Sequence, residues 1–268
     1  MRFSLLGVTL CASLLSVTAS GAPLEPSAKW VVDFGEAHCI AARDYKTLGN
    51  IYSLILQPSP IGDNFEVLIV RTGSGPEFVQ ELAATVAFDG LQAKTFNLSY
   101  GQTKPRMRHF DIYHLSSAQM EGARNARIVT FDSEHTAPLS FNLTSMPALL
   151  DNLAACSRDL KRYWNYDGKN TGAIASPASV KLRDIFKDDD FPVEARNRNQ
   201  QGRGRFLLLI DQMGKVANCT VIESAGYPIF DIKSCAIITE RGKFKPALDA
   251  QGRPVRSVVQ TPRITYRF

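Results

Sequence analysis

Few side chains in this sequence have the types and the spacing that catalysis or metal binding requires. The four histidines, which share no metal-ligand spacing, are His38, His109, His114 and His135. Asp188-Asp189-Asp190 lacks the alternating oxygen ligands and the glycine of a calcium-binding loop. Ser224 lacks the pair of glycines of a nucleophile elbow, and no Lys-Ser or Lys-Thr pair follows Gly202-Arg203-Gly204 as in a phosphate-binding loop. The sequence therefore predicts no catalytic residues, no metal site, no cofactor and no enzyme.

The first residues have the layout of a secretory signal. Met1-Arg2 precedes an apolar stretch over residues 3–17, and small residues follow up to Ala22. The apolar stretch would form a helix roughly 22 Å long, shorter than the roughly 30 Å hydrocarbon core of a membrane. We therefore predict a signal peptide over residues 1–21, cleaved after Ala19 or Gly21. An uncleaved signal that anchors the chain is the alternative, and only then would the chain contact a membrane.

Removal of the signal would remove Cys11 and leave four cysteines, which are Cys39, Cys156, Cys219 and Cys235. In an oxidising compartment, four cysteines allow three patterns of pairing. If the near pair Cys219 and Cys235 bonds, Cys39 and Cys156 remain, and each half of the chain has one bridge. No two cysteines have CxxC spacing, which argues against a zinc ribbon or a thioredoxin-like redox site.

A stretch rich in Gly, Ser, Ala and Asp divides the chain, and we place a linker over residues 166–187. Before it we expect a β-rich domain over residues 24–165, and after it a second domain over residues 188–268. Residues 181–268 hold 16 Lys or Arg and 10 Asp or Glu, a balance of 16 minus 10, or +6. Export argues against a nucleic-acid partner, so this charge favours a solvated basic face, an acidic partner segment or an anionic cell-wall polymer.

Apolar residues alternate with polar ones along most of the first domain, which is typical of half-buried strands. The expected strands are Cys39–Tyr45, Tyr52–Leu56, Phe65–Arg71, Leu82–Phe88, Lys94–Tyr100, Met107–Leu115, Arg127–Phe131 and Leu139–Leu143. Many short strands joined by short turns predict an antiparallel sandwich or an open barrel.

One helix interrupts this pattern. Ser145 is a candidate N-cap, Pro147 suits a first helical turn, and apolar residues then recur at helical spacing up to Tyr163. Cys156 lies on the apolar stripe, where it can join the helix to the first strand through Cys39. The closed loop of over a hundred residues would stabilise the fold by about 4 to 5 kcal/mol in the chain-entropy model.

The second domain has a different order of elements. Asp190 is expected to cap a short helix, Gly214 to turn one strand into the next, and Asp231 to cap a second helix that ends near Glu240. A last strand ends at Phe268. The predicted order is helix, strand, strand, helix, strand, with a three-stranded antiparallel sheet, and the whole chain is expected to be an α+β protein.

An ordered set of short motifs in this domain resembles the C-terminal domain of TonB-type energy transducers. The matching motifs are Phe191-Pro192, Ala195-Arg196, Ile210-Asp211, Gly214 with Val216, Glu223-Ser224 with Gly226, Phe244 with Pro246-Ala247, and Gly252 with Pro254-Val255. The sequence departs from the family at Phe230-Asp231, where Leu is usual. The resemblance covers residues 188–268 and does not extend to residues 24–180.

The resemblance implies a periplasmic, protein-binding role in a Gram-negative envelope. In the family, this domain binds an extended segment of an outer-membrane receptor, which adds as a strand to the small sheet. By analogy the binding edge is Val258, Val259, Gln260 and Thr261, and the partner is an outer-membrane receptor or another envelope protein. Some family members also have one cysteine at each of the two places of Cys219 and Cys235, and that bridge would contribute roughly 3 kcal/mol.

Two features leave other roles open. Full energy transduction requires an inner-membrane anchor helix and a long proline-rich spacer, whereas the 14 prolines here are dispersed and a β domain stands in the place of the spacer. One alternative is an envelope scaffold whose basic tail binds cell-wall polymer. Another is a ligand-binding or enzymatic activity in residues 24–165, with the tail as an adaptor.

Overall fold

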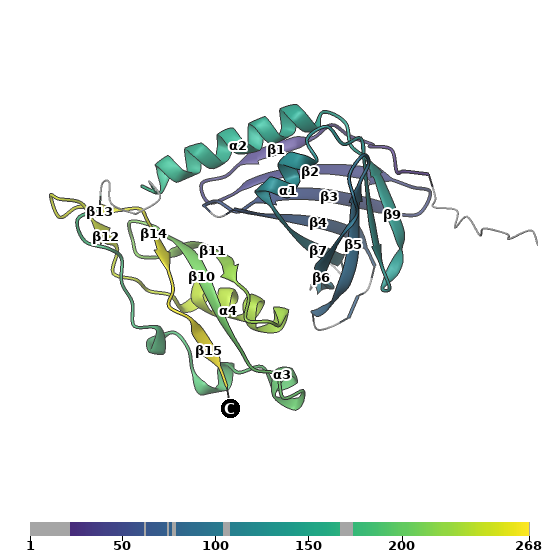
Figure 1. Ribbon diagram of the computed structural model, residues 1–268. Helices are drawn as coiled ribbons and strands as arrows, with labels where there is room; N and C mark the ends of the chain where they lie inside the picture. Colours follow the sequence, from purple (N-terminus) through teal and green to yellow (C-terminus); the bar gives the residue numbers. More distant parts are fainter. Residues whose placement is uncertain are drawn as a thin grey trace, which may run out of the picture.

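The computed structural model describes residues 22–61, 63–73, 75–76, 79–103, 108–166 and 174–267. The signal peptide expected over residues 1–21 lies outside these ranges. No helix within them is long and apolar enough to cross a membrane. The described chain forms a large antiparallel β domain and a small domain of strands and helices beside it (Figure 1), so the α+β class is confirmed.

Nine strands form the sheet of the β domain. They are β1 (Val31–Phe34), β2 (Cys39–Lys46), β3 (Ile51–Pro58), β4 (Asn64–Thr72), β5 (Gln80–Phe88), β6 (Lys94–Thr103), β7 (Arg108–Ser116), β8 (Ile128–Ser133) and β9 (Thr136–Asn142). The order across the sheet is β1-β2-β3-β4-β7-β6-β5-β8-β9, and every neighbouring pair is antiparallel. Strands β2 to β9 overlap the eight strands that the alternating pattern predicts.

The first described residues close the curved sheet. The backbone N–H of Leu24 donates to the carbonyl oxygen of Ser140 in β9, and the N–H of Ser27 donates to that of Asp44 in β2. This segment therefore bridges the last strand and the second. Inside, Tyr45 meets Phe141 edge to face, with ring centroids 4.9 Å apart. The sheet therefore curves around an aromatic core, and the segment that contains Leu24 and Ser27 connects its β9 side to β2.

Two helices cover part of this sheet. Helix α1 (Ser117–Gly122) follows β7, and helix α2 (Met146–Tyr163) lies over β1 and β2 (Figure 1). The disulfide Cys39–Cys156 joins α2 to β2. Ser145 is the N-cap residue of α2, as expected, but its side chain makes no capping hydrogen bond. Its backbone instead adopts a left-handed conformation with a φ of 64°.

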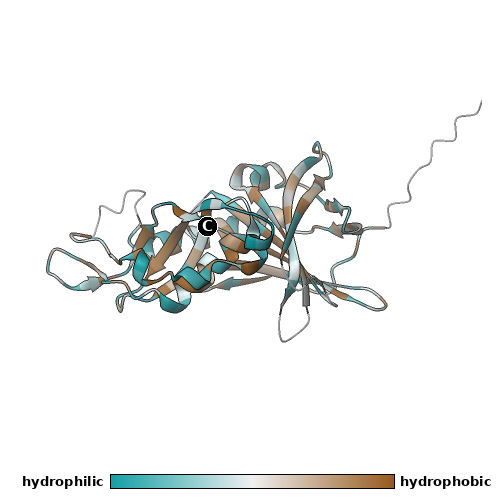
Figure 2. Cartoon of the chain, turned by 90° about the horizontal axis from the view of Figure 1, so that it is seen from below, coloured by the Kyte–Doolittle hydropathy of each residue, from teal (hydrophilic) through white to brown (hydrophobic). Residues whose placement is uncertain are grey.

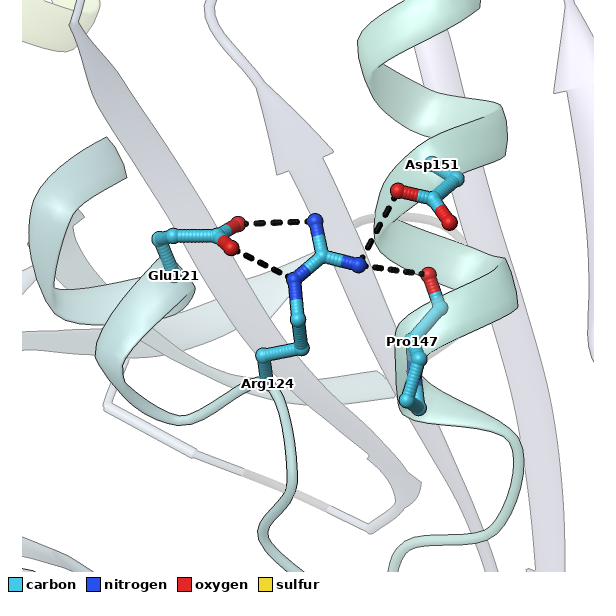
Figure 3. Close-up of polar contacts among 4 residues, drawn as sticks. All are labelled: Glu121, Arg124, Pro147 and Asp151. Atoms are coloured by element: carbon cyan, nitrogen blue, oxygen red, sulfur yellow. Dashed lines mark hydrogen bonds and ion pairs between the residues drawn. The ribbon is translucent and has the colours of Figure 1, made fainter.

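Arg124 fastens the two helices together on the surface (Figure 3). Its guanidinium group donates to the carboxylate of Glu121, to the carbonyl oxygen of Pro147 at 3.2 Å and to the carboxylate of Asp151 at 2.9 Å. Hydrogen bonding to Arg124 lowers the pKa of Glu121 below its usual value. The end of α1 is therefore held against the first turn of α2.

Part of the segment expected to be a linker packs on the C-terminal domain. Two residues of the range 174–187 form isolated β-bridges with the C-terminal domain. Ser176 pairs with Leu248, and Ser179 pairs with Lys245. Ile185 is buried in the core of that domain, just after a 3-10 turn at Leu182–Asp184. Because these residues pair with it and pack into its core, the segment before residue 188 is structurally part of the C-terminal domain.

The C-terminal domain is built around one long strand. Its elements are the 3-10 turn Asp188–Asp190, α3 (Val193–Asn197), β10 (Gly202–Ile210), β11 (Val216–Glu223), α4 (Pro228–Arg241), β12 (Ala247–Leu248), β13 (Pro254–Val255), β14 (Ser257–Gln260) and β15 (Ile264–Tyr266). β11 pairs with one side of β10, and β14 and then β15 pair with the other. The third strand of the predicted sheet is thus split in two, with Pro262 in the break.

The two faces of this sheet meet different partners. Phe206, Leu208 and Ile210 belong to a core that includes residues of α4. Leu207 and Leu209 point to the opposite face, where they join the hydrophobic cluster of the β domain. Figure 2, which is coloured by hydropathy, shows hydrophobic and hydrophilic residues side by side in the part of the chain around the marked C-terminus. The small sheet is therefore covered on both faces, by α4 and by the β domain.

Candidate partner-binding edge and interdomain cavity

Strand β14 lies at one end of the strand order β11-β10-β14, and it contains three of the four residues expected to bind a partner. Val258 is 3% exposed and belongs to the hydrophobic cluster of the β domain. Val259 packs against the core beneath α4. Thr261 is buried just after the strand, and Gln260 is exposed. Three of the four side chains therefore hold the sheet together.

The backbone of Gln260 faces away from the sheet. Thr261 donates its N–H to the carbonyl oxygen of Phe206 at 2.9 Å, and its hydroxyl accepts from the N–H of Phe206 at 3.1 Å. In an antiparallel pair, successive residues direct their backbone groups to opposite sides. The N–H and C=O of Gln260 therefore point away from β10, toward the place that an added strand would occupy.

Close packing fixes β10, on which β14 depends. A side chain at Gly202 would place its first carbon 1.9 Å from the carbonyl oxygen of Ala225, and one at Gly214 would lie 1.9 Å from that of Phe244. Only glycine allows these backbone segments to approach so closely. The ends of β10 are thereby locked to the turn before α4 and to the segment after it.

The chain end is fixed by Tyr266 in β15. Its ring stacks on Phe230 of α4 with centroids 4.4 Å apart, and its hydroxyl hydrogen-bonds with that of Ser234. Burial raises the pKa of Tyr266. This contact holds β15 against α4, so the break at Pro262 lies between two anchored strands.

A disulfide joins Cys219 of β11 to Cys235 of α4. Together with Cys39–Cys156, this is the pairing that gives each half of the chain one bridge. The bridge ties the strand opposite β14 to the helix beneath the sheet. Both edges of the small sheet are thus attached to α4, one covalently and one through packing.

Asp231 does not begin α4, which is a correction of the expected cap. The helix begins at Pro228, and the carboxylate of Asp231 accepts from the N–H of Ala225 at 2.8 Å and from the hydroxyl of Ser224 at 2.5 Å. Burial raises the pKa of Asp231 although these hydrogen bonds act in the opposite direction. Asp231 caps the turn that precedes the helix, and Ser224 is a residue of that turn.

Asp190 is likewise not the direct cap of α3. Its carboxylate accepts from the backbone N–H of Lys187 at 2.7 Å and from the guanidinium of Arg241 at 2.8 and 3.0 Å. Burial acts to raise the pKa of Asp190, but these hydrogen bonds outweigh it and the pKa is lowered. Asp190 therefore fastens the start of the domain to the end of α4.

The histidines do not converge. His38 lies 3.1 Å from the carboxylate of Asp33, and His135 lies 3.4 Å from that of Asp111, at separate places. The side chain of His109 is outside the described part. No group of three or more His, Cys, Asp or Glu that could hold a metal ion occurs among the described residues.

A cavity that the sequence motifs did not predict lies between the two domains. Its volume is about 570 Å³, and strands β4 to β7 form one wall while β11 and α4 form the other. Glu66 of β4 and His114 of β7 are direct cross-strand neighbours on the first wall. Asp231 and the disulfide cysteines lie on the second wall. A local pattern could not reveal a site whose walls are separated by a hundred residues.

Comparison with known proteins places only the C-terminal part. No curated protein and no solved structure matches the chain. Residues 188–268 match the family model described as Gram-negative bacterial TonB protein C-terminal. The residues that form β10, β11, α4, β14 and β15 all lie in this range. This part of the chain is therefore similar to TonB C-terminal domains, and the resemblance of its motifs is confirmed.

Proposed function

We propose that the chain is a periplasmic protein-binding module whose C-terminal domain binds an extended segment of an outer-membrane protein. The family match supports a TonB-like role in the Gram-negative envelope. Binding through added backbone hydrogen bonds needs no catalytic residue, in keeping with a site made of strand edge alone. The proposed partner is an outer-membrane receptor or another envelope protein.

The outward backbone of Gln260 carries this proposal. An added strand would donate to its carbonyl oxygen and accept from its N–H, while its neighbours Val259 and Thr261 bond inward to β10. The break at Pro262 limits the pairing at one end because proline has no N–H to donate. The binding segment is therefore short, and its affinity depends on few backbone bonds.

A proline at position 260 tests the proposal. Gln260→Pro removes one outward N–H and no hydrogen bond to β10, whereas Gln260→Ala keeps the N–H and removes only the side chain. Both variants and the unchanged protein would be sedimented with outer-membrane vesicles of a Gram-negative bacterium. We expect Gln260→Ala to bind as the unchanged protein does and Gln260→Pro to lose at least about tenfold in affinity, the equivalent of one hydrogen bond. Equal binding of all three would contradict strand addition at β14.

The basic tail favours a second candidate, an envelope scaffold bound to anionic cell-wall polymer. The balance of +6 in residues 181–268 would attract such a polymer. Electrostatic binding of this kind weakens steeply with salt, whereas backbone pairing does not. Sedimentation with isolated cell wall between low and high salt separates the two. Salt-sensitive binding that Gln260→Pro leaves intact would favour the scaffold.

Periplasmic location is tested by the N-terminal residue of the native protein. Cleavage after Ala19 or Gly21 would give chains that begin at Ser20 or Ala22, free in the periplasm. Recovery of Met1 in an inner-membrane fraction would instead support an anchored transducer.

A further inference from the structure

The interdomain cavity has the size of a ligand site. Its volume of about 570 Å³ falls within the roughly 300 to 1,000 Å³ of small-molecule pockets. Aliphatic side chains from both domains line it, namely Ile112, Leu115, Val221, Ile222 and Ile232. Polar side chains, both charged and uncharged, lie among them. Such a mixture suits a ligand with an apolar body and one or two polar groups.

The charged groups that line the cavity are acidic. They are Glu66 of β4, Glu81 of β5 and Asp231 of α4, and His114 of β7 is the other titratable side chain. No lysine or arginine is among the described lining residues. The described lining of the cavity is therefore acidic although the chain as a whole is basic, with a net charge of +5.

The carboxylates of Asp231 and Glu66 differ in their hydrogen bonds. Asp231 already accepts two hydrogen bonds, from Ala225 and Ser224. Within the described chain, no hydrogen bond to the carboxylate of Glu66 is found. Burial raises the pKa of Glu66, and the nearby His114 only partly opposes this. Glu66 is half-buried, and a carboxylate that faces an apolar cavity without a hydrogen-bond donor would be stabilised by a bound cation.

We propose that this cavity binds an alkylammonium ligand, with the ammonium group at Glu66 and the aliphatic part along the isoleucines and leucine of the two walls. The ammonium donates to Glu66, and Ser99 and Asn64 border the same space. Because β11 and α4 supply one wall, the occupied cavity joins the TonB C-terminal domain to the β domain. The ligand is either a free amine or the lysine side chain of a peptide, which share this chemistry.

Calorimetry with defined probes tests the proposal. The probes are hexylamine, hexanol of equal length without the charge, and the peptide Ala-Ala-Lys-Ala-Ala. We expect hexylamine or the lysine peptide to bind and hexanol to bind at least about tenfold more weakly, the equivalent of one charged hydrogen bond. Tighter binding of hexylamine identifies a free amine as the source, and tighter binding of the peptide identifies a lysine side chain. Equal binding of hexanol and hexylamine, or binding of none of the probes, overturns the proposal.

Two variants locate the site. Glu66→Gln keeps the shape and removes the charge, and Glu134→Gln, on an exposed turn of the β domain, is the matched control. We expect Glu66→Gln to lose at least about tenfold in affinity for the cationic probe and Glu134→Gln to lose none. Thermal unfolding serves as the check of folding, because removal of a desolvated charge leaves the protein equally stable or more stable. Equal affinity in both variants overturns the proposal.

The pH dependence is a second readout. Binding requires ionised Glu66, whose pKa is raised by burial. Affinity is expected to fall as the pH drops through this raised pKa. The fall should be smaller in Glu66→Gln, in which only Asp231 and Glu81 remain as acidic groups of the described cavity lining. A pH profile that is the same in the variant and in the unchanged protein contradicts the assignment to Glu66.

Discussion

Single residues with no side chain decide how closely the segments of the C-terminal domain approach. Gly214 has a φ of +79° and lies directly against the carbonyl oxygen of Phe244, where a first side-chain carbon would be 1.9 Å away. Gly252 has a similar φ of +74° but has no atom within 4 Å of that position. The pair separates the cost of a left-handed backbone from the cost of a steric clash.

Gly214→Ala should therefore destabilise the protein far more than Gly252→Ala. Gly252→Ala, the control, should lose about 1 kcal/mol of unfolding free energy because alanine is unfavourable in a left-handed backbone. Gly214→Ala should lose about 3 kcal/mol or more because the backbone must also move away from the new side chain. Urea denaturation of both variants measures the difference. Equal losses of unfolding free energy would contradict this prediction and show that the segment after α4 moves aside at little cost.

Asp190 should make the free energy of unfolding depend on pH in the acidic range. Its pKa is lowered in the folded protein, so the folded state releases the proton more readily than the unfolded chain does, and Asp190 stabilises the fold above the ordinary value of 3.8. Asp190→Asn should cost about 1 to 3 kcal/mol at neutral pH, the range for hydrogen bonds to charged groups. The difference from the unchanged protein should shrink as the pH falls below about 4. Denaturation at several pH values measures it, and a constant difference would refute the role of the charge.

At the scale of elements, the two disulfides constrain loops of very different length. Cys39 and Cys156 are 117 residues apart, and Cys219 and Cys235 are 16 apart. Replacing the first pair by alanine should cost about 4 to 5 kcal/mol and replacing the second about 3 kcal/mol, because the longer loop gains more entropy in the unfolded chain. Denaturation under oxidising conditions compares the two double variants. The reverse order would mean that local strain or residual structure decides instead.

Alternating apolar residues predicted most of the sheet because β2 to β9 each bury one face. β1 was missed because Val31–Phe34 is largely exposed and shows no alternation, and α1 was missed because six residues with one buried side chain give no period. The start of α4 was misplaced because Asp231 resembles a cap, whereas its carboxylate binds the preceding turn.

The candidate sites differ in how far the sequence predicted them. The edge at β14 followed from the resemblance of residues 188–268, although the roles of its side chains did not, since Val258 and Thr261 are buried by contacts within the fold. The cavity could not be predicted, because Glu66 and Asp231 meet only when two domains pack. Two residues 165 positions apart, here 231 minus 66, that line one cavity leave no trace in local periodicity.

At the scale of the whole molecule, the two domains share contacts as well as a cavity. The amide of Asn218 donates to the carbonyl oxygen of Ala37 at 3.1 Å, and that of Asn165 donates to the carbonyl oxygen of Arg256 at 2.7 Å. The guanidinium of Arg256 lies 3.9 Å from the centre of the Tyr163 ring. Together with the hydrophobic cluster that includes residues of both domains, these contacts make the molecule one unit.

We therefore expect one cooperative thermal transition. Arg256→Ala should lower the unfolding free energy by about 1 kcal/mol, the loss of a partly buried cation–π contact. Arg253→Ala, at an exposed position near it, should change it by less than about 0.5 kcal/mol. Calorimetry of the three proteins measures both effects. Two separate transitions in the unchanged protein would show that the domains unfold independently.

The central claim is that an outer-membrane partner adds a strand at β14, and the backbone amide of Gln260 reports it most directly. Hydrogen exchange at this amide would be followed in the protein alone and with saturating outer-membrane vesicles. An added strand accepts a hydrogen bond from this N–H, so its exchange should slow at least about tenfold. The amide of exposed Gln251, in the turn between β12 and β13, should not change. Bound protein in which the Gln260 amide exchanges at its original rate would contradict the claim.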